Sequence, residues 1–470
     1  MSAAAASRSG YSRPPVDFLR PVRQKMTLKI SDNRRFLVHY DGTPFFYLAD
    51  TAWELFHRLT REEAALYLQT RAEQKFTVIQ AVVLAEHGFD VPNAYGFLPL
   101  EGNDPLQPVE GYFAHVDWIV RRANSLGLMV GMLPTWGDKW NLDWGVGPEI
   151  FTLDNAYRYG LFLGRRYAGD DIIWNLGGDR AVAGDTQREI IAAMAKGLSD
   201  GDGGAHLRTF HPPGPLSSSQ YFPDAAWLDF HQWQSGHSRN SMNYASISAD
   251  YARLPIKPVL DGEPGYEDHP ADFDWNVPGA TARNGYLDEH DVRKTAYWSL
   301  FAGACGYTYG CHDIWQFLDT SRFPAVTVAR TPWKEALALP GACQMQHVRA
   351  LMLSRPVLTR IPDQSLLLSD PGCSTEHAQA TRDSEGRYAF VYTPSGQPVS
   401  INLTLLRGEI LNGWWYDPRT GSSQLIGPVL QGASGAFTPP STGQDWILVL
   451  DDIAQRFPPP GEPLSGALSA

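Results

Sequence analysis

The sequence predicts an α/β fold, a (β/α)8 TIM barrel followed by a C-terminal all-β sandwich domain. Eight apolar, β-branched stretches, most of them followed by a helical pattern, lie between residues 45 and 310. Two of these stretches end abruptly in glycine and a carboxylate, as a buried parallel strand does where it opens into a site. After residue 355 the helical periodicity gives way to short strands separated by Gly, Pro, Ser and Thr.

Length and composition agree with a two-domain chain. The 470 residues exceed the usual size of one domain, and 43% of them are hydrophobic, enough for a large core. The net charge of -12 argues against a nucleic-acid partner, because phosphate binding needs a basic patch. No apolar run approaches the 18 residues or so that span a membrane, so we expect no membrane partner.

Four segments are expected along the chain. We predict a flexible arm over residues 1–25, the barrel over 26–355, the β-sandwich over 356–455 and a tail over 456–470. A small hairpin over residues 28–40 is expected to precede the barrel. The first residues lack the apolar core of a signal peptide, which favours a cytoplasmic chain, or an exported one if a leader has been removed. The four cysteines show no metal-binding spacing and are expected to be free thiols.

Each barrel element has its own pattern. The predicted strands cover residues 45–50, 78–84, 129–136, 171–176, 207–211, 228–232, 258–261 and 306–310. The predicted helices cover residues 60–75, 113–126, 155–167, 186–198, 241–251 and 291–303. Thr60 and Glu63 form a capping-box pattern at the start of the first helix. An open doubly wound sheet is the alternative, but no glycine-rich phosphate loop follows the first strand. In the second domain, strands are expected over residues 366–368, 388–392, 401–403, 413–416 and 446–450.

Two carboxylates stand at the ends of the fourth and seventh strands. Asp179 follows two glycines, and Glu263 lies between Gly262 and Pro264. Strand ends meet at one face of a barrel, and a pair of carboxylates there is typical of glycosidic bond hydrolysis. Structural roles are the alternatives to catalysis. Asp179 could cap a helix or pair with an arginine, and Glu263 could form a buried ion pair. Asp261 lies on the same side of an ideal strand as Glu263 but deeper, which favours a supporting role.

Other strand ends carry polar or aromatic side chains that suit the hydroxyls and ring faces of a sugar. Glu86 and Gln234 lie at such strand ends, together with the residues that we expect to bind substrate. We expect the following residues to bind a carbohydrate substrate: Asp50, Trp53, His87, Trp136, Asp138, Asn175, His211, Gln232, Tyr307, Tyr309 and His312. The histidines lack metal-site spacing, so we expect neither a metal ion nor a cofactor.

Several stretches resemble the apiosidase-like glycoside hydrolases of family 140: PFFYLADTAWEL (44–55), LTREEA (59–64), NLGGD (175–179) and DGE (261–263). The stretch WWYDPRTG (414–421) is similar to the β-domain usually fused to that barrel and often labelled collagen-binding. The resemblance covers about residues 28–452. It implies a (β/α)8 barrel in which Asp179 is the general acid/base and Glu263 the nucleophile.

The sequence therefore predicts a glycoside hydrolase that uses two carboxylates in a retaining mechanism. The resemblance implies furanosides such as apiose or arabinose in plant or bacterial glycans. A catalytically inactive carbohydrate-binding protein on the same scaffold is the alternative, and a metal-dependent hydrolase comes third. The oligomeric state stays open.

Overall fold

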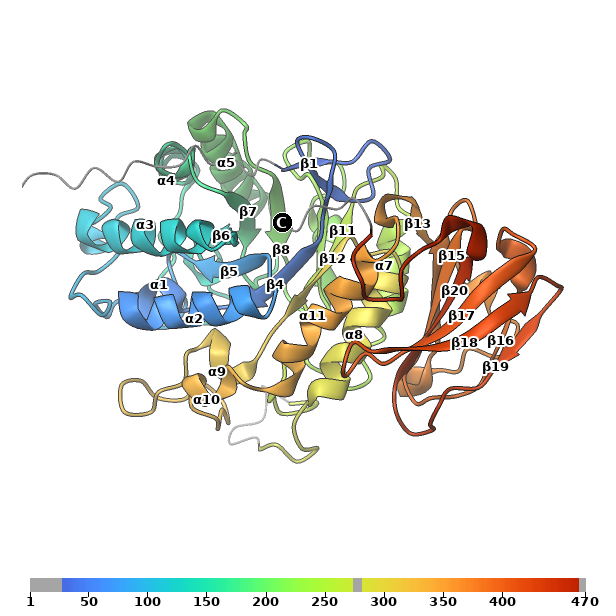
Figure 1. The fold of residues 1–470 in the computed structure, drawn as a ribbon. Helices are drawn as coiled ribbons and strands as arrows, with labels where there is room; N and C mark the ends of the chain where they lie inside the picture. Colours follow the sequence, from blue (N-terminus) through green and yellow to red (C-terminus); the bar gives the residue numbers. More distant parts are fainter. Residues whose placement is uncertain (1–27, 274–280, 465–470) are drawn as a thin grey trace, which may run out of the picture.

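The computed structural model describes residues 28–273 and 281–464, so the predicted arm and the last part of the predicted tail lie outside the described residues. A helix-wrapped sheet contains the first three quarters of the chain, and antiparallel sheets contain the last quarter (Figure 1). The predicted (β/α)8 barrel with a C-terminal β-domain is confirmed. All four cysteines are free.

Eight parallel strands form the barrel. Their hydrogen-bonded order is β8-β7-β6-β5-β4-β12-β11-β10, and the short β9 (Leu216–Ser217) pairs antiparallel with β10. The ring closes where Asp229 N, two residues before β10, donates to Arg208 O of β8 over 2.9 Å. The bounds are β4 (Tyr47–Thr51), β5 (Val78–Val82), β6 (Met129–Leu133), β7 (Ile172–Gly177), β8 (Arg208–His211), β10 (His231–Gln234), β11 (Val259–Glu263) and β12 (Gly306–Tyr309).

The sixth barrel strand begins three residues later than predicted. The apolar pattern pointed to residues 228–232, whereas pairing with β11 begins at His231. Leu228 and Phe230 are buried, but they precede the residues that pair with β11. An apolar run reports burial, and it does not report where backbone pairing starts.

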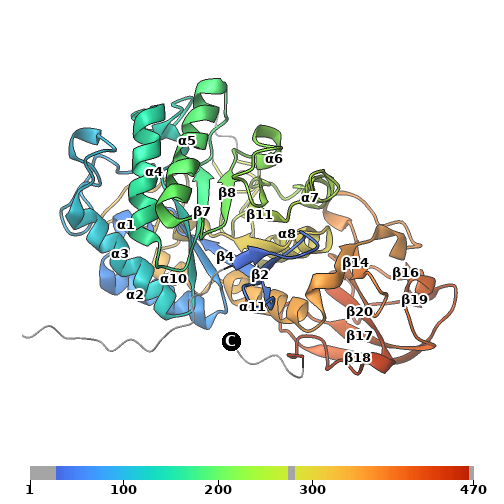
Figure 2. The same cartoon turned by 90° about the horizontal axis from the view of Figure 1, so that it is seen from above.

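Helices cover the outside of the barrel (Figure 2). The predicted capping box at the first long helix is confirmed, because Glu63 N donates to Thr60 Oγ1 and Thr60 N donates to Glu63 Oε2. The long helices are α2 (Arg61–Glu73), α3 (Glu110–Ser125), α4 (Leu153–Tyr167), α5 (Asp185–Asp202), α7 (Asn243–Tyr251), α8 (Glu289–Phe301) and α11 (Pro340–Leu353). Short helices are α1 (Leu55–Arg58), α6 (Ser218–Tyr221), α9 (His312–Trp315) and α10 (Trp333–Ala336). Neither α11 nor the four short helices were predicted from the sequence.

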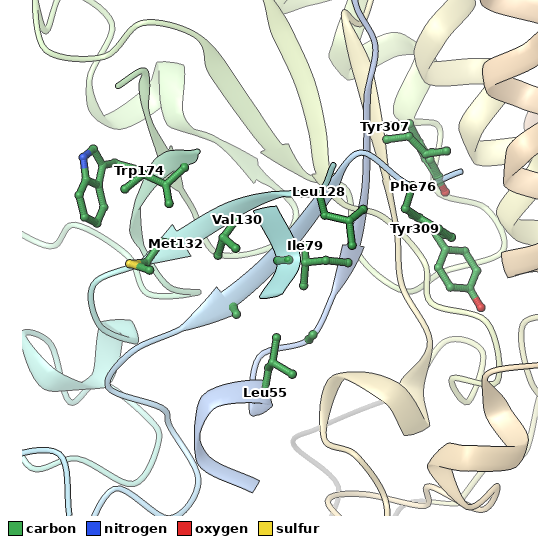
Figure 3. Packing of buried hydrophobic residues seen from close by; sticks show 14 of the residues in the cluster. Leu55, Phe76, Ile79, Leu128, Val130, Met132, Trp174, Tyr307 and Tyr309 are labelled. Atoms are coloured by element: carbon green, nitrogen blue, oxygen red, sulfur yellow. The ribbon is translucent and has the colours of Figure 1, made fainter. Parts of the chain in front are cut away.

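The main apolar core lies between strands and helices (Figure 3). Side chains of a barrel strand point alternately into the barrel and toward the helices. Ile79, Val130, Trp174, Tyr307 and Tyr309 belong to the outer set and pack in this core. A second cluster fills the barrel interior, and the predicted hairpin, observed as β1 (Leu28–Ile30) with β2 (Leu37–His39), packs against that cluster next to β3 (Pro44–Phe45).

The C-terminal domain has a six-stranded antiparallel sheet and a two-stranded one. The larger sheet has the order β13 (Arg360–Pro362), β14 (Gln379–Asp383), β15 (Tyr388–Thr393), β20 (Trp446–Asp452), β17 (Ile410–Tyr416) and β18 (Ser423–Leu430). The smaller sheet pairs β16 (Val399–Ile401) with β19 (Gly435–Phe437). One face of β15 packs on α8, with Tyr392 stacked on Tyr297 and Phe390 on Phe301.

This domain differs from the sequence prediction in several places. Strands β13, β18 and β19 were not predicted, and only the first residue of the predicted strand 401–403 lies in a strand, β16. The stretch 366–368 is not a strand, because Gln364–Leu366 forms a 3-10 helix and Leu367 makes an isolated bridge. The buried strand β14 was missed because its sequence, QATRD, is polar. Ion pairs of Arg382 and Asp383 with residues outside the strand compensate that burial. Within the described residues, no helix is both long and apolar enough to cross a membrane.

Candidate active site

Asp179 is positioned by a left-handed turn after β7. Gly177, Gly178 and Asp179 all have positive φ, at 99°, 113° and 56°. A Cβ on Gly178 would lie 2.6 Å from the backbone nitrogen of Gly137, so only glycine fits there. Gly178 N donates to His211 O, which ties the turn to the end of β8. The two glycines therefore place the Asp179 carboxylate, as the sequence indicated.

Glu263 is turned into the site by a β-bulge in β11. In the pairing with β10, Trp233 faces Asp261 and the next residue, Gln234, faces Glu263, so Gly262 has no partner. The bulge changes the side to which Glu263 points relative to an ideal strand. Asp261 therefore does not share the direction of Glu263, which corrects the expectation from regular alternation. Its carboxylate accepts hydrogen bonds from Asn243 and Ser299 on the surrounding helices and from Ser235.

A single imidazole joins the two catalytic candidates. Asp179 N donates to His211 Nδ1 over 3.3 Å, so the His211 proton is on Nε2. That nitrogen lies 2.6 Å from Glu263 Oε2, at ion-pair distance. His237 Nε2 lies 3.5 Å from the other oxygen, Glu263 Oε1. Both carboxylate oxygens of Glu263 thus face a histidine.

These contacts push the two pKa values apart. Burial raises the pKa of Asp179 well above its ordinary value, and the charge of Glu263 raises it further, against the opposing charge of Arg180. Burial alone would raise the pKa of Glu263, but hydrogen bonds from His211 and His237 outweigh it and lower that pKa to about 2. The opposite shifts make Asp179 the better proton donor of the two carboxyls and Glu263 the better anion.

Aromatic rings form one wall beside the pair. The ring centroids of Trp53 and Trp136 lie 5.3 Å apart, and each is within 5.7 Å of the His211 ring. Trp53 Nε1 donates to Tyr266 Oη, and Glu263 helps to raise the pKa of the buried Tyr266 phenol. Trp136 Nε1 is buried without a hydrogen-bond partner among the described residues, so it is available to a substrate hydroxyl.

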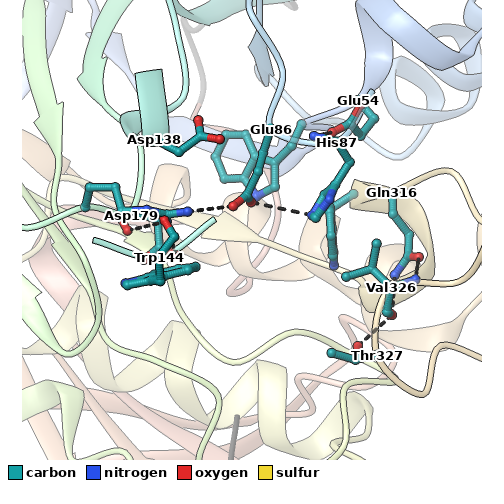
Figure 4. Close-up of polar contacts among 12 residues, drawn as sticks. Glu54, Glu86, His87, Asp138, Trp144, Asp179, Gln316, Val326 and Thr327 are labelled. Carbon is teal, nitrogen blue, oxygen red and sulfur yellow. Dashed lines mark hydrogen bonds and ion pairs between the residues drawn. The ribbon is translucent and has the colours of Figure 1, made fainter. Parts of the chain in front are cut away.

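A second set of contacts starts from the other side of Asp179. Arg180 is fully buried, and its Nη2 donates to Glu86 Oε1 over 2.6 Å. Glu86 lies between Asp179 and Trp144 on one side and His87 on the other (Figure 4), and its Oε2 is 3.5 Å from His87 Nε2. Together with the pair, these contacts close into a loop that we name the site ring: Glu263, His211, Asp179, Arg180, Glu86, His87, Trp315, His312, His269 and His237.

Amides form a polar group in the barrel interior. Gln80 Nε2 donates to Gly262 O and to Thr308 Oγ1, and Gln80 Oε1 accepts from Asn175 Nδ2. Asn175 Oδ1 and both side-chain heteroatoms of Gln232 are buried without a partner among the described residues. A buried polar group needs a partner, so these atoms suit a bound water or a sugar hydroxyl.

The structure brings most of the predicted site residues together, but four have other surroundings. Asp50 points toward α2, where Arg71 Nε lies 2.6 Å away. Tyr307 bonds to Thr295 of α8 and Tyr309 to Glu267, both in the layer between barrel and helices. Asp138 is paired with Lys139 at 2.8 Å and accepts from Gly147 N. All four support the scaffold in this structure rather than facing the pair.

Six contributors were not among the predicted site residues: Arg180, Trp144, His237, Tyr266, His269 and Trp315. Arg180 follows Asp179 directly and was considered only as its structural partner. Trp144, His237 and Tyr266 come from segments after barrel strands, where a sequence pattern gives no register. Trp144 and Tyr266 are aromatic, and this was the only available signal.

One cluster of possible metal ligands occurs among the described residues, at the start of α8. It comprises Asp288, His290 and Asp291. Asp288 caps the helix by accepting from His290 N and Asp291 N. This cluster is explained by capping and by the Asp291–Lys294 ion pair of 2.9 Å.

Comparison with known families agrees with this geometry. A family model described as "Apiosidase-like, catalytic domain" matches residues 31–359. The chain belongs to the apiosidase-like family. A second model, "Putative collagen-binding domain of a collagenase", matches residues 361–451 and covers the β-domain.

Solved structures show the same relationship over nearly the whole chain. One described as a glycoside hydrolase is 34% identical, with a TM-score of 0.81 over 91% of this chain and 97% of the other. A glycoside hydrolase family 5 protein from Bacteroides vulgatus ATCC 8482 is also 34% identical, with a TM-score of 0.81 over 91% and 93%. A search of curated proteins gives no match. The apiosidase-like protein described here is thus a glycoside hydrolase, and its substrate is a carbohydrate.

Proposed function

We propose that this apiosidase-like enzyme is a retaining glycosidase in which Glu263 is the nucleophile and Asp179 the general acid/base. The observation that carries the proposal is the low pKa of Glu263, about 2, set by His211 and His237. A general base works best with a pKa near the operating pH. A nucleophile must instead be ionised and must later leave as a stable carboxylate, and a low pKa serves both needs. The pair therefore suits double displacement better than activation of water by Glu263.

The reaction would proceed in two balanced steps. Glu263 attacks the anomeric carbon while Asp179 gives its proton to the leaving oxygen, which yields a glycosyl ester and an alcohol. Formation of the ester removes the negative charge of Glu263, which contributes to the raised pKa of Asp179. The Asp179 carboxylate can then take a proton from water, which attacks the anomeric carbon and releases the sugar and the Glu263 carboxylate. The same group thus acts first as acid and then as base.

We further propose that the glycosyl group is a furanose such as apiose or arabinose. The family description supports this choice. The rings beside the pair also support a small sugar, because Trp53 and Trp136 are each only 5% exposed and leave little open surface.

A panel of aryl apiofuranosides and arabinofuranosides, with aryl pyranosides as controls, tests both parts. We expect hydrolysis of a furanoside, with the first-formed anomer having the configuration of the substrate by NMR. Glu263→Gln should abolish turnover of every glycoside. Asp179→Asn should cost about 10²–10⁴-fold on poor leaving groups and much less on 4-nitrophenolate, which needs no proton.

Asp261→Asn is the matched control, since it changes the neighbouring carboxylate of the same strand and should keep most of the activity. Inverted product would overturn the nucleophile assignment. Full activity of either catalytic variant would overturn the pair. Hydrolysis of pyranosides alone would overturn the furanoside assignment and leave the pair standing.

A further inference from the structure

Trp144 is an exposed tryptophan beside the proposed acid. It is 51% exposed, whereas Trp53 and Trp136 in the aromatic wall are 5% exposed. It lies in the segment that follows β6. Neighbouring Leu142 and Val146 are also exposed, at 45% and 54%. This segment therefore presents apolar surface next to the site ring.

The indole is held in place despite its exposure. The Arg180 guanidinium lies 3.3 Å from the ring centroid, and Arg180 Nε donates to Trp144 O over 2.6 Å. Arg180 is itself fixed, because Nη1 donates to Asp179 O and Nη2 to Glu86. Gly145 has φ +116°, and a Cβ there would collide with the guanidinium.

The buried Asp138–Lys139 pair holds the rest of the segment. Asp138 Oδ2 accepts from Gly147 N over 2.7 Å, and Lys139 Nζ donates to Gly147 O over 2.8 Å. Neither side chain is exposed to solvent. Bonds at both ends of the segment thus fix Trp144 before any ligand binds, which reduces the entropy lost on binding.

One face of the indole is covered by the guanidinium, so its exposed surface belongs to the other face and the edge. A flat apolar face suits the C–H face of a sugar ring. Arg180 Nη1 also lies 3.6 Å from Asp179 Oδ2, so the acid and the indole contact the same guanidinium. The general acid stands at the oxygen that joins the glycosyl group to the leaving group.

We propose that Trp144 is the platform for the leaving-group sugar, and that the natural substrate is therefore a glycan in which the released glycosyl group is attached to another sugar. This inference rests on the proposed role of Asp179 as the acid. The buried aromatic wall of Trp53 and Trp136 contacts the glycosyl group, and the exposed indole of Trp144 contacts the leaving-group sugar. Arg180 does not act as an anion site here, because Glu86 already neutralises it.

The test compares two leaving groups on one glycosyl group. The aryl panel, which contains furanosides and pyranosides, first identifies the glycosyl group that the enzyme releases. That glycosyl group is then used in two probes: its methyl glycoside, and a disaccharide in which it is linked to glucose. In the full-length enzyme, Trp144→Ala should lower the ratio of kcat/KM for disaccharide over methyl glycoside about tenfold, equivalent to about 1.4 kcal/mol. Trp144→Phe should keep most of the ratio, and Trp144→Leu, apolar but not flat, should lose it.

Tyr40→Ala is the matched control. Tyr40 is a 74% exposed ring with Lys29 Nζ 5.4 Å from its centroid, and it lies in the turn after β2. Its removal should leave the ratio unchanged. An unchanged ratio in Trp144→Ala and Trp144→Leu would overturn the proposal, as would an equal loss on both glycosides, which would show that Trp144 only shields the Arg180–Glu86 pair. Failure of the acid assignment would appear separately, as full activity of Asp179→Asn on the methyl glycoside.

Discussion

Replacement of His211 by phenylalanine tests whether histidine contacts keep Glu263 ionised. In the native enzyme the pKa of Glu263 is about 2, against an ordinary value of 4.5. His211 makes the shorter of the two contacts, at 2.6 Å against 3.5 Å for His237. A hydrogen bond to a charged group contributes about 1.5–3 kcal/mol. At about 1.36 kcal/mol per pH unit, its loss should raise the pKa of Glu263 by about 1–2 units.

The assay is the pH profile of kcat/KM, which reports the free enzyme. Activity needs ionised Glu263, so the acid limb should move from near pH 2 to about pH 3–4 in His211→Phe. His211→Gln, whose amide can still donate, should recover part of the shift. The stability effect has the same sign: a depressed carboxylate pKa stabilises the fold above its unfolded value of about 4.5, and this contribution is lost as pH falls toward 2.

His206→Phe is the matched control for His211→Phe. His206 Nδ1 lies 2.9 Å from Asp202 Oδ2 in a buried pair that includes no residue of the site ring. Its loss should lower the melting temperature and leave the acid limb in place. If His211→Phe folds and its acid limb stays where the native one is, the histidine contacts do not set the ionisation of Glu263, and the argument for Glu263 as nucleophile fails.

Two further predictions concern the scaffold. Gly178→Ala should lower activity, because the new Cβ would lie 2.6 Å from Gly137 N and disturb the turn that carries Asp179. Gly169→Ala is the control, since a Cβ at that position would have no atom within 4 Å. Equal activities of the two variants would refute the reasoning. Arg355→Met should reduce the free energy of unfolding by about 3–5 kcal/mol, because it leaves Asp451 of the β-domain buried and unpaired. Arg355→Met with Asp451→Leu should recover most of that loss in a denaturant titration, and a loss below about 1 kcal/mol in the single variant would contradict the estimate.

The order of strands and helices could be predicted because each barrel strand carries a local signal. Apolar runs such as residues 129–133 and 172–176 mark burial on both faces, and Thr60 with Glu63 marks a helix start. The polar strand β14 could not be predicted in this way. Its burial depends in part on the ion pair of Arg382 with Asp363, 19 residues earlier in the chain, which no local pattern records.

The direction of side chains was the main error within the site. A position at a strand end does not say whether the side chain faces the barrel axis or the helices. Asp50, Tyr307 and Tyr309 follow regular alternation and face the helices. Glu263 escapes this alternation through the bulge at Gly262, which depends on pairing with a neighbouring strand.

The sequence by itself determined the two-domain architecture and the two carboxylates that end β7 and β11. Local patterns suffice for this, because a few neighbouring residues in the sequence indicate both a buried strand and a glycine turn. Only the tertiary structure decided how the two carboxylates differ. Burial and the charge of Glu263 raise the pKa of Asp179 against the charge of Arg180, whereas His211 and His237, which come from other strand ends, lower the pKa of Glu263. The contacts of Arg180 also place Trp144 beside Asp179, whereas the sequence shows only one tryptophan among fifteen.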